Sequence, residues 1–154
     1  MHTADHHAYS IDHLSCITQG PFLGMDWGRK RVGLAISNPE NTVSMPLCVV
    51  QTGAMLRATL NQAWHDYAIQ ALIIGWPVHA NGQTSPMCAP ILRLAHRLHH
   101  EHNWPIALWD ERFTTRSVNA VIIDKKNVVD DHAAALILEG AMTRWQNIRK
   151  TPQV

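Results

Sequence analysis

The hydrophobic positions in the first third of the chain form three short runs, and each run predicts a strand. The runs cover residues 21–26, 31–37 and 43–50. Gly28 separates the first from the second, and the polar turn sequence at residues 38–41 separates the second from the third. Strands that a short turn joins run antiparallel, because parallel neighbours need a longer crossover connection. We therefore expect an antiparallel three-stranded start to the fold.

The rest of the chain alternates helix patterns with strand patterns. Continuous apolar runs at residues 71–75 and 106–109 are typical of strands buried on both faces. Apolar residues recur at helical spacing in three other stretches, and each stretch predicts a helix. The first helix covers residues 54–67 and the last covers residues 130–145. The middle helix begins with Ser85 as its N-cap and Pro86 at its first position. Strands that alternate with helices after an antiparallel start predict a mixed α/β sheet flanked by helices.

The length of the chain, 154 residues, is that of one ordinary domain. Residues 1–20 carry scattered histidines and follow neither the helical nor the strand period, so we expect a flexible N-terminal extension. The predicted domain then covers residues 21–148, and residues 149–154 form a C-terminal tail.

Several features of the composition favour a cytoplasmic protein without membrane contact. No apolar run reaches the roughly 20 residues that a membrane span needs, and the N-terminus lacks the basic and apolar regions of a signal peptide. The three cysteines form no C-x-x-C pair, which is typical of a reducing compartment. The formal net charge of +1 neither favours nor excludes a nucleic-acid partner, so a polyanion site would require local clustering of cations.

Three acidic residues lie at the edges of apolar runs, far apart in the sequence. Asp26 ends the first predicted strand, Glu111 follows the last one, and Asp130 begins the last predicted helix. Hard divalent cations prefer oxygen ligands, and two such ions about 4 Å apart can cleave a phosphodiester bond. The three carboxylates therefore predict a nuclease site that binds magnesium or manganese, provided that the fold brings them together.

Each of these residues also has a purely structural interpretation. Asp26 would cap a hairpin, Glu111 would belong to a salt-bridged strand end with Arg112, and Asp130 would be an N-cap whose role Asp131 could take. The sequence D-x-G after a first strand also suits the phosphate loop of actin-like kinases, but these need a second domain for which the chain is too short. His96 and His100, spaced i, i+4, would suit zinc.

Four segments of the chain, in this order, resemble the motifs of the YqgF/RuvX family: GMDWGRKRVGLAIS, ALIIGWPVHANG, LWDERFTT and VVDDHAAALILEG. Members of this family have an RNase H-like fold and are described as Holliday junction resolvases and as pre-16S rRNA nucleases. The resemblance implies catalytic metal ligands at Asp26, Glu111 and Asp130. It also implies substrate contacts at Lys30, Arg31, Thr114 and Thr115. Arg112, next to Glu111, supplies a cation suited to phosphate, so we expect it to contact substrate as well.

The chain departs from the family pattern at a few positions. Arg29 stands where the family commonly has threonine, and Asn38 and Trp76 replace residues of two further motifs. The segment between Thr115 and Asp130 is shorter and less basic than is usual in the family. Basic residues still lie near the acidic residues in the sequence, and they are Arg29, Lys30, Arg31, Arg112, Arg116, Lys125 and Lys126. Contacts between such residues and phosphates supply affinity with little sequence selectivity.

The expected function is therefore that of a metal-dependent endonuclease acting on structured nucleic acid, with 5′-end processing of pre-16S rRNA as the first hypothesis. The alternatives are a Holliday junction resolvase-like DNA nuclease and a non-catalytic nucleic-acid-binding module. A carboxylate site attacks phosphate in either RNA or DNA, and the 2′-hydroxyl contacts that discriminate them are not readable in the sequence.

Overall fold

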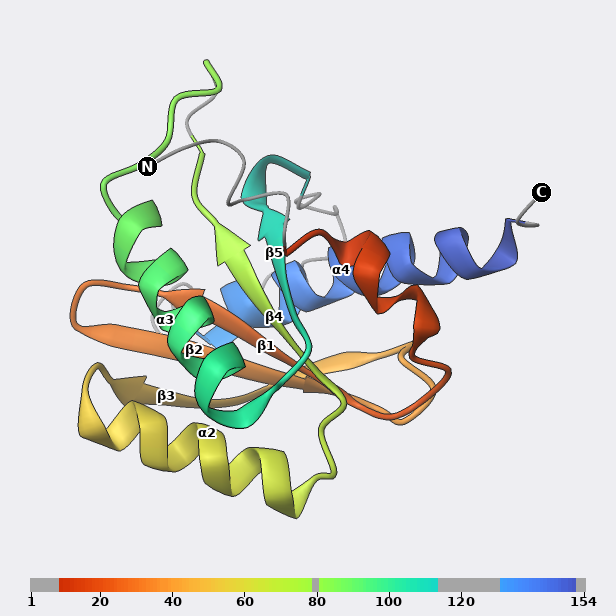
Figure 1. Ribbon diagram of the computed structural model, residues 1–154, viewed down its shortest axis with the longest axis horizontal. Helices are drawn as coiled ribbons and strands as arrows, with labels where there is room; N and C mark the ends of the chain where they lie inside the picture. The colour runs from red at the N-terminus through yellow and green to blue at the C-terminus, as the bar shows by residue number, and fades with distance from the viewer. Residues whose placement is uncertain (1–8, 79–80, 114–130, 152–154) are drawn as a thin grey trace.

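The computed structural model describes residues 9–78, 81–113 and 131–151. Within these residues, five strands form one sheet in the order β3-β2-β1-β4-β5 (Figure 1). β1 and β4 lie at the centre, and β3 and β5 lie at the edges. The strands are β1 (Phe22–Trp27), β2 (Arg31–Ser37), β3 (Ser44–Gln51), β4 (Ala71–Trp76) and β5 (Ile106–Asp110).

The pairing of the strands confirms the predicted mixed sheet. β1 pairs with β2, and β2 with β3, in antiparallel fashion. β1 also pairs with β4, and β4 with β5, in parallel fashion. Short turns produce the first arrangement, whereas α-helical crossovers produce the second, as expected for parallel neighbours. β2 has the bounds that its apolar run predicts.

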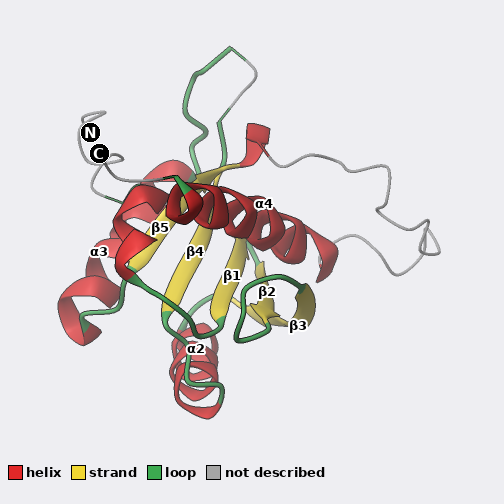
Figure 2. Ribbon diagram, turned by 90° about the vertical axis from the view of Figure 1, so that its right-hand side faces the viewer, coloured by secondary structure: helices red, strands yellow, loops and turns green. Residues whose placement is uncertain are grey.

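Helices cover both faces of the sheet (Figure 2). α2 (Ala54–Asp66) and α3 (Cys88–His102) pack on one face, and α4 (Asp131–Lys150) and the short 3-10 helix η1 (Ile11–Cys16) pack on the other. A second 3-10 turn, η2 (Glu111–Phe113), directly follows β5. None of the helices that the structure describes is both long enough and apolar enough to cross a membrane.

The N-terminal segment corrects the predicted domain boundary. Residues 1–20 were expected to be a flexible extension, but the described part from Tyr9 onward is packed, and Leu14 is only 2% exposed. The Tyr9 carbonyl accepts a hydrogen bond of 2.7 Å from the Leu108 amide on β5, and the Leu14 carbonyl accepts one of 2.9 Å from Trp145 Nε1. A short 3-10 helix carries no 3.6-residue apolar period, which is why the sequence pattern did not indicate it.

Two helix boundaries also differ from their predictions. α4 continues to Lys150 rather than ending near residue 145, and Arg149 Nη1 donates hydrogen bonds to the carbonyls of Ile17 and Thr18. The predicted tail therefore begins at least two residues too early. α3 begins at Cys88 rather than at Pro86, because the Cys88 amide donates to the Ser85 carbonyl in a separate turn before the helix.

Candidate active site

The carboxyl ends of three parallel strands meet at one edge of the sheet. Asp26 is the penultimate residue of β1, and Glu111 follows the last residue of β5. β4 lies between these two strands (Figure 1). Ligands of open α/β sheets bind outside the carboxyl ends of strands, so the two acidic residues occupy the expected place for a site.

Strand alternation directs the Asp26 carboxylate to the face that α4 covers. Successive side chains of a strand point to opposite faces. Phe22 belongs to the apolar cluster that β1 shares with α4, and Asp26, four residues later, points to the same side. Glu111 lies in η2, just after β5, and its Oε1 lies beside Gly75, at a point that Ile137 of α4 also contacts. Both carboxylates therefore lie on the α4 side of the sheet.

Gly75 on β4 creates the space in which the Glu111 carboxylate lies. A Cβ atom at position 75 would be only 2.7 Å from Glu111 Oε1 and 2.6 Å from Ile137 Cδ1. Any larger residue would therefore have to displace either the carboxylate or α4. The sequence motifs did not indicate Gly75 as a site residue, although a glycine inside a buried strand is a signal of close approach.

Asp26 and Glu111 form a hydrogen-bonded carboxyl pair across β4. Burial, then the negative charges of Asp26 and Asp110, and finally the hydrogen bond with Asp26 raise the pKa of Glu111 from 4.5 to about 7. Two carboxyl groups this close favour a shared proton, because both cannot ionise without repulsion. A divalent cation would relieve the same repulsion, so the oxygen donors present here fit magnesium or manganese.

We expect Glu111→Gln to raise the free energy of unfolding at pH 8 and to have a much smaller effect at pH 4.5. The raised pKa means that folded protein retains a proton that the unfolded chain releases between pH 4.5 and about 7. The ionised side chain therefore lowers stability as the pH rises through this range. Because the side chain is partly exposed, we discount the shift to a gain on the order of 1 kcal/mol.

Urea unfolding without divalent cations, at both pH values, measures this gain. An equal difference between variant and wild type at pH 4.5 and pH 8 would contradict the expectation, because packing changes alone do not depend on pH in this way.

Asp110 and Arg112 form a separate ion pair beside the carboxyl pair. Arg112 Nε donates to both carboxylate oxygens of Asp110 at 3.1 Å, and Nη2 donates to Oδ2 at 2.7 Å. The Arg112 amide also donates to Asp110 Oδ1 at 2.9 Å. The salt-bridge interpretation of this motif therefore applies to Asp110 and Arg112, whereas Glu111 pairs with Asp26 instead. The Arg112 side chain remains 41% exposed and can still meet a ligand.

The predicted basic residues near Asp26 lie in and beside the β1–β2 turn. Arg29, Lys30 and Arg31 are exposed. A Cβ atom at Gly28 would lie 2.4 Å from the Arg31 carbonyl oxygen, so this tight return of the chain requires glycine. The turn places three cations within five residues of the Asp26 carboxylate.

Three predicted site residues lie outside the described residues, namely Asp130, Thr114 and Thr115. Among residues 9–78, 81–113 and 131–151, no three His, Cys, Asp or Glu side chains form a group that could hold a metal ion. The described metal-binding candidates are therefore the two carboxylates of Asp26 and Glu111. On α3, His96 Nδ1 lies 2.7 Å from Tyr9 Oη and shares a hydrogen bond with it.

Sequence and fold comparisons extend these observations. The family model RuvX, described as a Holliday junction resolvase, matches residues 20–144. This chain belongs to the RuvX family. Curated relatives carry the name "Putative pre-16S rRNA nuclease". One, from Orientia tsutsugamushi, is 37% identical over 133 residues, 81% of this chain and 85% of the relative. Another, from Bradyrhizobium diazoefficiens, is 30% identical over 140 residues, 85% of this chain and 87% of the relative.

The RuvX-family chain also resembles a solved resolvase structure. The T. thermophilus RuvC in complex with a Holliday junction substrate superposes with a TM-score of 0.56 over 84% of this chain and 96% of that one, at 13% identity. This likeness confirms the predicted RNase H-like fold. The RuvX family match begins at residue 20, so the packed segment from Tyr9 to Gln19 lies outside it.

Proposed function

We propose that this RuvX-family protein is a metal-dependent endonuclease that hydrolyses phosphodiester bonds in structured RNA, with the 5′ end of pre-16S rRNA as substrate. The hydrogen-bonded pair of Asp26 and Glu111 carries the proposal, because it brings two oxygen donors together at the carboxyl edge of an RNase H-like sheet. The names of the curated relatives support the choice of substrate.

In this proposal Asp26, Glu111 and Asp130 would hold the divalent ions. When bound, the ions would activate water and stabilise the leaving oxygen. The chain's own residues prepare the site: Gly75 leaves the space for Glu111, and Glu111 must release its proton before it can act as a ligand. Asp110 orients Arg112 beside them.

Substrate phosphates would meet the cations around this edge of the sheet. These contacts position the backbone without selecting a sequence. The proposed contact residues are Lys30, Arg31, Arg112, Thr114 and Thr115.

A Holliday junction nuclease is the second candidate, because the matching family model carries that description. The carboxyl pair by itself suits phosphate in either polymer. The two candidates differ in the substrate that the protein cleaves.

Parallel cleavage assays test both candidates. We expect a pre-16S rRNA with its 5′ leader to be cleaved with magnesium or manganese and to remain intact with EDTA, while a four-way DNA junction is cleaved at least about tenfold more slowly. The Glu111→Gln variant, purified in the same way, excludes a contaminating nuclease. Faster cleavage of the junction would favour the DNA candidate. Binding of RNA without cleavage under any metal condition would indicate a non-catalytic binding module.

A further inference from the structure

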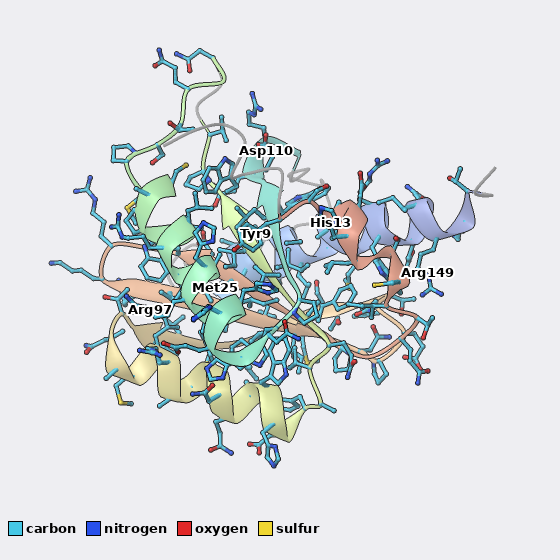
Figure 3. All side chains as sticks on the ribbon, viewed as in Figure 1. Tyr9, His13, Met25, Arg97, Asp110 and Arg149 are labelled. Carbon is cyan, nitrogen blue, oxygen red and sulfur yellow. The ribbon has the colours of Figure 1, made fainter. Side chains whose placement is uncertain are left out.

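The solvent-facing side of α3 carries a row of histidine and arginine side chains. Its members are spaced i, i+3, i+4 and i+7, which places them on one face of a helix; they are Arg93, His96, Arg97 and His100. All four are exposed, whereas Ile91, Leu94, Ala95 and Leu98 bury the opposite face of α3 against the sheet. We call these four residues the α3 basic face. Figure 3 labels Arg97 within it.

Within the part of the chain that the structure describes, the two arginines of the α3 basic face have no neutralising partner. Arg93 and Arg97 form neither an ion pair nor a hydrogen bond in the described part of the chain, unlike Arg57, Arg112 and Arg144. Glu101 is the carboxylate residue in the sequence of α3, and Arg57 of α2 already binds it. The charge of the two arginines is therefore available to an external anion.

The helix begins beside the candidate active site. Cys88, its first residue, donates a hydrogen bond of 3.2 Å from Sγ to the carbonyl of Pro77, which follows β4. Burial and, to a smaller extent, the charge of Glu111 raise the pKa of the Cys88 thiol, so the two side chains are electrostatically coupled. At 1.5 Å per residue, Arg93 and His100 lie about 8 Å and 18 Å from Cys88 along the helix. In Figure 1, α3 runs away from the carboxyl end of β4.

We propose that the α3 basic face binds the phosphate backbone of a base-paired arm of the RNA substrate, outside the scissile region. This inference rests on the proposed nuclease function, because it assigns a docking surface to the same substrate. The roughly 10 Å from Arg93 to His100 along the helix allows the face to meet more than one phosphate of a strand. Rigid spacing on a helix suits a duplex, whose phosphates are regularly placed.

Binding measurements with a double variant test this inference. Arg93→Gln with Arg97→Gln is made in the Glu111→Gln background, so that RNA stays intact during the measurement. The probes are an RNA hairpin with a single-stranded 5′ leader and the leader alone. The matched control is Arg144→Gln with Lys150→Gln, which removes the same charge from the exposed side of α4. Thermal melting checks that both variants fold.

For the hairpin probe, we expect the double variant to lower affinity by roughly tenfold at 0.1 M salt and to reduce the slope of log K against log salt by about two. The leader alone and the α4 control should show little change. In the wild-type background, KM should rise while the single-turnover rate at saturating RNA stays the same.

Wild-type affinity and salt slope in the double variant would overturn the inference, as would an equal loss with the α4 control or with the leader alone. If the double variant loses hairpin binding and the wild-type protein does not cleave RNA, the nuclease function is overturned but the docking surface is supported. Normal cleavage by wild type together with unchanged binding by the variant would overturn the docking surface alone.

Discussion

Asp26→Asn and Glu111→Gln should each lower the rate of metal-dependent RNA cleavage by at least about a thousandfold. Each change removes one negative oxygen donor while keeping nearly the same side-chain shape. A thousandfold loss corresponds to about 4 kcal/mol of transition-state stabilisation, which is the scale of losing a preorganised charged group. Because the two carboxyl groups contact each other, the double variant should lose little more than either single variant.

Single-turnover cleavage at saturating RNA and magnesium measures this loss. Glu139→Gln, which neutralises an exposed carboxylate on α4, is the matched control and should retain the wild-type rate. Activity retained in both site variants would end the assignment of Asp26 and Glu111. Asp130→Asn is expected to behave like them and Asp131→Asn to be milder. If only the Asp131 variant loses activity, that residue and not Asp130 is the third ligand.

Leu14→Ala should lower the free energy of unfolding by about 2–3 kcal/mol and the melting temperature by roughly 5–10 °C. Leu14 is 2% exposed and lies in the apolar cluster that includes Trp109 and Trp145. Deletion of residues 1–19 should cost more, because it also removes the carbonyl that accepts the Trp145 Nε1–H and the carbonyl that pairs with the Leu108 amide. A buried donor without an acceptor is costly in itself.

Thermal and urea unfolding of the variants test the role of this segment. Cys16→Ala, at an exposed position of the same 3-10 helix, is the control and should change stability by less than about 0.5 kcal/mol. A truncated protein that melts within about 2 °C of wild type would show that η1 contributes little to the core, in spite of its burial.

Local patterns in the sequence were sufficient for much of the sheet. β-branched runs and turn residues act between neighbours in the chain, so they predicted β2 with its observed bounds and placed the other strands within about a residue or two. The same patterns put Asp26 and Glu111 at strand ends. The motif resemblance, which the family match confirms, implied that both residues bind metal, and this role stays a prediction.

The motif resemblance implied that Asp26 and Glu111 share one site, but no local pattern of the sequence showed how they meet. Asp26 and Glu111 belong to strands that are not adjacent, and their contact depends on β4 lying between them with glycine at position 75. No pattern within one segment carries that information. Likewise, Asp110 and Glu111 are neighbours in sequence, but their side chains have different partners. Asp110 forms an ion pair with Arg112, and Glu111 forms a hydrogen bond with Asp26.

The N-terminal segment shows the same division between local and long-range information. Tyr9, Ile11 and Leu14 lack a regular period, so the sequence predicted a flexible extension. Ile11 and Leu14 are buried in the apolar cluster that includes α4, whereas Tyr9 belongs to the cluster on the α3 side and shares a hydrogen bond with His96. The carbonyls of Tyr9 and Leu14 accept hydrogen bonds from Leu108 and Trp145, which lie more than 90 residues away along the chain. Sequence patterns thus determined the strands and the acidic residues at their ends, where neighbouring residues control the backbone. Long-range packing decided the carboxyl pair, its raised pKa and the extent of the core.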